Sequence, residues 1–133
     1  MYKNILIPLD CSIVDEVIIE HIIKMCSIMN PGIHLVRALH LHTRDALNYS
    51  ESVTAEYMEK VKERFASINI TAETIIEYGD PDEVISKIAI EKNCDLIAFA
   101  THGHKKVMDF LLGSVVEKVR HKTSIPILLI KAG

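Results

Sequence analysis

The residues with the clearest potential for ligand chemistry are Gly113 and Ser114, directly before an amphipathic segment. If this pair opens a helix, unpaired main-chain N–H groups and the positive end of the helix dipole would suit a phosphate. The glycine would let a ligand approach the main chain, and the serine hydroxyl adds a donor. Residues 114–117 are equally a capping box that serves only the helix. Both interpretations stay open from these residues alone.

Two further candidates follow apolar segments of the chain. Asp10 comes after residues 5–9, where its carboxylate could bind a ribose hydroxyl or a base edge, or could equally cap the next helix. Gly103 either permits a positive φ in a loop or lets a phosphate lie against the main chain. The neighbouring Lys105 and Lys106 would supply counter-charges, or form a solvated pair. Ligands of open parallel sheets bind beyond the strands' carboxyl ends, so both positions are candidates.

Histidines and cysteines offer weaker possibilities. The histidines that could converge are His40, His42, His102 and His104. A zinc or iron site usually needs three or four ligands, and no cysteine or carboxylate completes this set. The cysteines are Cys11, Cys26 and Cys94. They lack a C-x-x-C spacing and a recognisable base partner, which favours reduced packing thiols over nucleophiles. We predict neither a metal site nor a catalytic residue.

The elements that must position these residues alternate between short apolar runs and helix-like segments. Apolar runs typical of strands occupy residues 5–9, 33–42, 94–100 and 125–130. Residues 70–78 alternate apolar and polar residues, which predicts a less buried strand near a sheet edge. Apolar residues at spacings of three and four predict helices over residues 12–29, about 53–68, from 81 and from 113 onward. Ser12 and Asp80 are the predicted N-caps of the first and third helices, with a proline at position 81. Residues 43–52 and 101–112 are predicted connections, the second partly helical.

This alternation indicates an α/β fold, with an open parallel sheet, helices on both faces and right-handed connections. A length of 133 residues fits one domain over residues 1–133. A hydrophobic content of 49% with a net charge of −3 excludes a disordered chain, and it disfavours nucleic acid and membrane surfaces as partners. The chain lacks an apolar run of about 20 residues, and its unpaired cysteines favour the cytoplasm.

Across essentially its whole length, the chain resembles the universal stress protein family. Residues 3–12 look like that family's first strand with its terminal aspartate, and residues 79–81 are similar to the start of its third αβ unit. Nucleotide-binding members carry a glycine, two residues, a second glycine, nine residues, then glycine and serine or threonine. Nine residues separate Gly103 from Gly113 and Ser114 here, but Ala100 stands at the first glycine. Its extra methyl group would weaken binding or change the base preference.

The resemblance implies a Rossmann-like, open five-stranded parallel sheet of order 3-2-1-4-5. It also implies that ATP, with or without Mg²⁺, or another adenine nucleotide, binds where strands one and four end. The positions concerned are Pro8, Asp10, Leu41, Ala100, Gly103, Gly113, Ser114 and Val115. Adenine would lie near the first three, the ribose near Asp10, and the phosphates over Gly103 and the N–H groups of residues 113–115.

The resemblance further implies a homodimer through the last strand, residues 125–130, although helices could instead cover that strand. The leading hypothesis is a regulatory adenine-nucleotide-binding protein of the stress response. The chain lacks an obvious general base, a Walker lysine and a compact carboxylate cluster for Mg²⁺, which disfavours a defined turnover. Two alternatives stay open: a dimeric interaction module that binds no nucleotide, and a slow ATPase.

Overall fold

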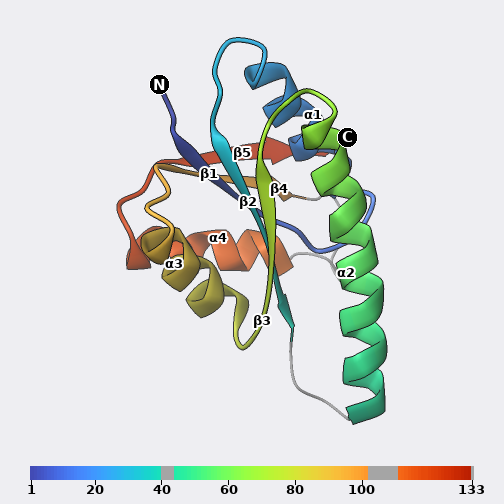
Figure 1. The fold of residues 1–133 in the computed structure, drawn as a ribbon. Helices are drawn as coiled ribbons and strands as arrows, with labels where there is room; N and C mark the ends of the chain where they lie inside the picture. The colour runs from blue at the N-terminus through green and yellow to red at the C-terminus, as the bar shows by residue number, and fades with distance from the viewer. Residues whose placement is uncertain (40–43, 102–110, 133) are drawn as a thin grey trace.

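A five-stranded parallel sheet organises the protein (Figure 1). The computed structural model describes residues 1–39, 44–101 and 111–132. The strands are β1 (Asn4–Pro8), β2 (Gly32–Leu39), β3 (Ala72–Tyr78), β4 (Leu96–Thr101) and β5 (Ile127–Lys131). Their order is β3-β2-β1-β4-β5, and every neighbouring pair is parallel. The predicted fold class and strand order are confirmed.

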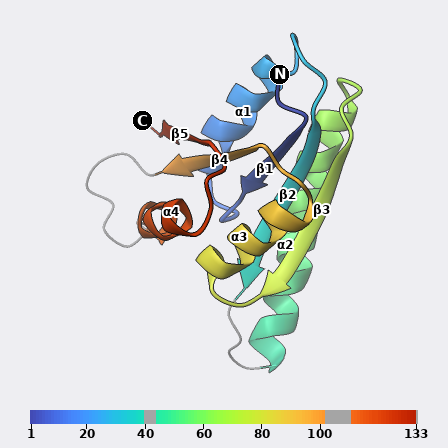
Figure 2. The ribbon, with the colours of Figure 1, turned by 90° about the vertical axis from the view of Figure 1, so that its left-hand side faces the viewer.

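Four helices cover the two faces of the sheet (Figure 2). They are α1 (Asp15–Met25), α2 (Arg44–Ala66), α3 (Pro81–Glu91) and α4 (Leu111–Lys122). Helices α1 and α2 pack on one face, and α3 and α4 pack on the other. None of the helices in the described ranges combines the length and apolar character that crossing a membrane requires.

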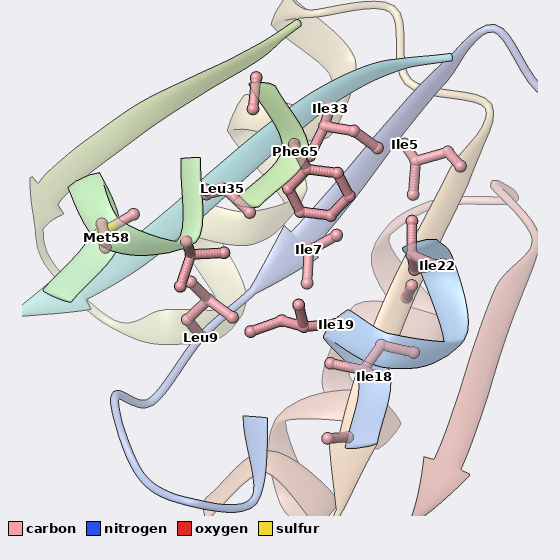
Figure 3. Packing of buried hydrophobic residues seen from close by; sticks show 14 of the residues in the cluster. Ile5, Ile7, Leu9, Ile18, Ile19, Ile22, Ile33, Leu35, Met58 and Phe65 are labelled. Atoms are coloured by element: carbon pink, nitrogen blue, oxygen red, sulfur yellow. The ribbon is translucent and has the colours of Figure 1, made fainter. Parts of the chain in front are cut away.

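The α1 and α2 face holds the larger apolar cluster (Figure 3). Phe65 and Met58 of α2 and Ile19 of α1 are fully buried against Ile7 of β1 and Leu35 of β2. Burying a side chain of this size contributes about 1.5–3 kcal/mol. This packing fixes α1 and α2 relative to β1, and so fixes the loop between β1 and α1.

The opposite face holds a second apolar cluster. Ile85 and Ile88 of α3 and Val115 and Val119 of α4 are buried there, against Val36 of β2 and its neighbours. The β-strand period of two explains why consecutive β4 residues serve different clusters. The carboxyl ends of β1 and β2 therefore face the start of α3 and the first turns of α4.

The boundaries of three helices differ from the prediction. Helix α2 begins at Arg44, so residues 44–52, predicted as a connection, are helical; no glycine or proline interrupts residues 44–66. Helix α1 begins at Asp15 instead of near Ser12 and ends at Met25, because turns occupy the residues on either side. Helix α4 begins at Leu111, two residues before Gly113, because two leucines, which favour helix, start it.

The predicted start of α3 is confirmed, with Asp80 as N-cap residue and Pro81 at the first helical position. Asp80 is extended, and its side chain makes no capping hydrogen bond. Gly79 has a φ of 142°, a conformation that other residues rarely adopt, and turns the chain from β3 into α3.

Candidate functional site

The carboxyl ends of β1 and β4 meet at the point where strand order reverses. The chain runs from β1 outward through β2 to β3 and then returns to place β4 on the other side of β1. Beyond the last β1 residue, the buried Pro8, the N–H of Leu9 still donates to the carbonyl of Val36, at 2.9 Å. Ligands of open α/β sheets bind in the crevice at this switch point.

Asp10 sits in a tight loop between β1 and α1. Its Oδ1 accepts a hydrogen bond from the N–H of Ser12 at 3.0 Å, and the hydroxyl oxygen of Ser12 accepts one from the N–H of Val14 at 3.2 Å. Cys11 between them has a φ of 63°, in the left-handed region. The N-cap position of α1 is Val14, without a side-chain cap, so Asp10 and Ser12 shape the loop instead of capping the helix.

Asp15, which the sequence analysis did not single out, binds the main chain of this loop through its carboxyl group. Its side chain is fully buried, and its Oδ1 and Oδ2 accept hydrogen bonds from the N–H groups of Asp10, at 3.2 Å, and Cys11, at 2.8 Å. The hydroxyl of Tyr57 on α2 donates a third, at 2.9 Å. Burial, reinforced by the charge of Asp10, raises the pKa of Asp15 to about 7 although these hydrogen bonds oppose the rise.

Two pockets share lining residues, and the smaller of them lies next to the loop. The larger has a volume of about 600 Å³ and is lined by Asp80, Pro81, Asp82, Ser114, Val115, Lys118, His121 and Lys122. The smaller, of about 40 Å³, is lined by Pro8, Leu9, Asp10, Val36, Arg37, Ala38, Pro81, Ile85 and Val115. They share Pro81 and Val115, and the smaller one has room for about one water molecule.

Charges of both signs surround the larger pocket. Lys122 Nζ lies 3.7 Å from the Oδ2 of Asp82. Lys118, one helical turn after Ser114 and on the same face of α4, has no carboxylate partner within the described part of the chain. Ser114 is exposed. The walls therefore offer a hydroxyl and an available cation side by side.

Arg37 on β2 has a side-chain nitrogen atom without a partner. Its Nε is buried and has no hydrogen-bond partner among the described residues, although buried donors are almost always paired. Because side chains alternate along a strand, the Arg37 side chain lies on the α1 and α2 face with Leu35, near Cys11, and not on the face of Val36. Its position could not be anticipated, because a lone arginine in a strand carries no motif.

The family model described as "Universal stress protein family" matches residues 1–131. The chain belongs to the universal stress protein family. It is 29% identical over 155 residues to universal stress protein MJ0577 of Methanocaldococcus jannaschii, covering 98% of this chain and 96% of that protein. The solved structure of MJ0577 matches with a TM-score of 0.88 and 28% identity, covering 100% of this chain and 98% of that chain.

Two further structures of the universal stress protein family share the fold. One, solved in complex with cAMP, has a TM-score of 0.72 and 17% identity, over 97% of this chain and 96% of its own. The other, from Archaeoglobus fulgidus in complex with dAMP, has a TM-score of 0.72 and 17% identity, over 98% of each chain.

Among the positions that the family resemblance implicates, four line the two pockets. Pro8, Asp10 and Val115 line the smaller pocket, and Ser114 and Val115 line the larger one. Gly113 is the third residue of α4, so its N–H belongs to the first turn, where N–H groups lack acceptors within the helix. Positions from the end of β1, from the loop after it and from the start of α4 thus line two pockets that share residues.

Among the remaining implicated positions, the structure describes Ala100. Ala100 is 1% exposed and packs in the cluster beneath α1, while Ile97 and Phe99 face α3 and α4. Strand alternation turns its methyl group to the α1 side of the sheet, and Ala100 lines neither of these two pockets. Leu41 and Gly103 lie outside the described residues, as do Lys105 and Lys106.

Metal and thiol chemistry find little support in the described ranges. No three His, Cys, Asp or Glu side chains within them gather in a way that could hold a metal ion. The four histidines considered above lie outside the described residues. All three cysteines are free, and burial raises the pKa of Cys11 and of Cys94 to about 11. Both thiols stay protonated at neutral pH, which does not suit a nucleophile.

Proposed function

We propose that this universal stress protein is a regulatory adenine-nucleotide-binding protein of the stress response, with ATP as its ligand. The observation that carries the proposal is the pocket of about 600 Å³ that adjoins the ends of β1 and β2. Its volume falls within the range of small-molecule sites, about 300–1,000 Å³. Relatives of the same fold solved with cAMP and dAMP support an adenine nucleotide in particular.

The residues of the inner pocket fit a base and a ribose. Pro8, Val36 and Val115 offer apolar walls for a purine. Asp10 would accept a hydrogen bond from a ribose hydroxyl. Because the inner pocket holds about one water molecule, the base would lie at its mouth with the nucleotide extending into the larger pocket.

The larger pocket fits the phosphates. The exposed Ser114 hydroxyl and the Lys118 ammonium group lie on one face of α4 and would donate to phosphate oxygens. The N–H of Gly113 in the first turn of α4 would add a main-chain donor. Asp80 also lines this pocket, and its carboxylate would accept a hydrogen bond from a water molecule on a phosphate-bound Mg²⁺.

Regulation suits these residues better than turnover. The nucleotide would stabilise one arrangement of the switch point over another, which requires only a difference in affinity between the two. We also propose a homodimer through β5, an edge strand whose Leu129 is 49% exposed, because pairing would protect its free edge. A cytoplasmic location fits the three free thiols.

Calorimetry with ATP, AMP and GTP on protein unfolded and refolded to remove bound nucleotide tests the proposal. We expect one ATP per chain, tighter binding of ATP than of AMP, and weaker binding of GTP. If neither ATP nor AMP binds up to millimolar concentration, the proposal is wrong and the interaction module remains.

Matched variants separate binding roles from folding roles. Asp10→Asn keeps the Oδ1 that accepts from Ser12 but removes the charge, so the loop should persist while the Kd for ATP rises about tenfold or more. Lys118→Ala should weaken the binding of ATP more than the binding of adenosine. Lys60 is an exposed lysine of α2, and Lys60→Ala should change neither affinity. Equal losses of affinity for ATP and adenosine in Lys118→Ala would show that Lys118 does not bind the phosphates.

A further inference from the structure

The buried carboxyl group of Asp15 ties three elements together beneath the proposed site. It belongs to the first turn of α1, and its oxygens accept hydrogen bonds from two consecutive main-chain N–H groups of the loop and from the hydroxyl of Tyr57 on α2. The loop bears Asp10, the proposed ribose ligand. A change in the ionisation of this carboxyl group therefore alters a hydrogen bond to the main chain of Asp10.

The groups that face this carboxyl come from every element packed around it. Asp10 and Cys11 lie on the loop, and Tyr57 is on α2. Glu16 on α1 adds a negative charge near Tyr57, and Arg37 on β2 adds a positive charge near Cys11. Burial and the charge of Asp10 together raise the pKa of Asp15 to about 7, so its ionisation changes across the neutral range.

Ionisation of Asp15 alters its hold on the loop. As a carboxylate it is an acceptor only, and hydrogen bonds to a charged acceptor are about twice as strong as neutral ones. When the carboxyl group is protonated, one of its oxygens carries a hydrogen, and the group forms weaker hydrogen bonds as an acceptor. Cys11 is in a left-handed conformation that only a few per cent of non-glycine residues adopt, so it depends on these bonds.

We propose that Asp15 is a positioning residue that makes nucleotide affinity rise with pH through the neutral range. This inference rests on the proposed function, since it concerns the same site. A ribose hydroxyl that donates to Asp10 draws off part of the negative charge that opposes ionisation of Asp15. Nucleotide binding and ionised Asp15 thus favour each other, and by linkage each strengthens the other equally.

Amide NMR on the nucleotide-free protein between pH 5.5 and 8.5 tests the hold on the loop. The amide signals of Asp10 and Cys11 should move together with one midpoint near pH 7, and Asp15→Asn should abolish that transition. Tyr57→Phe removes one donor to the carboxylate and should raise the midpoint while leaving the fold intact. Amide transitions that persist in Asp15→Asn overturn the inference, as does their absence from the unmodified protein.

Calorimetry with adenosine tests the effect on the site, because adenosine has no phosphate that titrates near pH 7. We expect adenosine to bind about fivefold tighter at pH 8 than at pH 6, and Asp15→Asn to bind it equally at both. Affinity that does not change with pH overturns this inference and leaves the proposed function standing. If ATP and adenosine both fail to bind at either pH, the proposed function falls with the affinity claim, and the amide titration alone decides whether Asp15 holds the loop.

Discussion

Replacing Asp15 with asparagine should change how the stability of the protein depends on pH. The carboxyl group is fully buried, and its pKa in the folded protein is about 7 against an ordinary value of 3.8. Between these two pH values the folded protein keeps a proton that the unfolded chain has lost. Asparagine has nearly the same shape and no proton to lose, so it removes this dependence.

The size and sign of the effect follow from proton linkage. A difference from 3.8 to about 7 corresponds to about 4 kcal/mol, at 1.36 kcal/mol per pH unit. Because the folded state binds the extra proton, the stabilisation is complete below the unfolded value and is lost as pH rises through about 7. The stability of the unmodified protein relative to Asp15→Asn should therefore fall by about 1.4 kcal/mol per pH unit from pH 4 to 7 and then level off.

Urea unfolding followed by circular dichroism at pH 5, 6, 7 and 8 measures this difference, because all other titrating groups are common to both proteins. Equal m-values would show that the two unfold with the same change in exposed surface. Glu20→Gln, an exposed carboxyl on the same helix, serves as the control and should run parallel to the unmodified protein. Parallel curves for Asp15→Asn would refute the reasoning, since they would mean that the folded and unfolded states bind the same number of protons at residue 15 between pH 5 and 7.

Three further substitutions and one control test the packing. Ala100→Gly should lower the free energy of unfolding in urea by about 0.5–1 kcal/mol. It should leave the Kd for ATP unchanged, because the Ala100 methyl group is in the α1 cluster and not at the pockets. A tenfold change in Kd would contradict that placement. Gly79→Ala should destabilise by about 1–3 kcal/mol, since φ is 142° and an added Cβ would lie 3.3 Å from the Cγ2 of Val84; an unchanged melting temperature would count against it. Phe65→Ala should cost about 3–5 kcal/mol, whereas Ile28→Ala, at 86% exposure, should cost less than about 0.5 kcal/mol; similar losses for both would contradict the core assignment.

Much of the architecture could be predicted because each strand is a short apolar run and each helix has an apolar stripe. The ends of the helices were harder to predict than the helices themselves. Residues 43–52 are polar, which suggested a connection, yet helix α2 begins at Arg44. Polarity alone does not exclude helix when no glycine or proline intervenes.

The side chains of the site were harder to predict than the fold. The apolar run of β4 has no polar alternation, so the sequence pattern could not tell which face Ala100 occupies. Asp15 carries no sequence motif that marks it as a buried residue. Its burial depends on Tyr57, 42 residues further along the chain, and therefore on tertiary packing. Local patterns carry no information on such a contact.

The most direct test of nucleotide binding at the switch point is a titration of the ¹⁵N-labelled protein with ATP, followed by amide NMR. The account predicts that the signals of Asp10, Val36 and Val115 move on ATP addition. Those of Lys3 and Asn93, at the amino ends of β1 and β4, should stay in place. Signals that do not move at 1 mM ATP, or that move only at the amino ends of the strands, would contradict it.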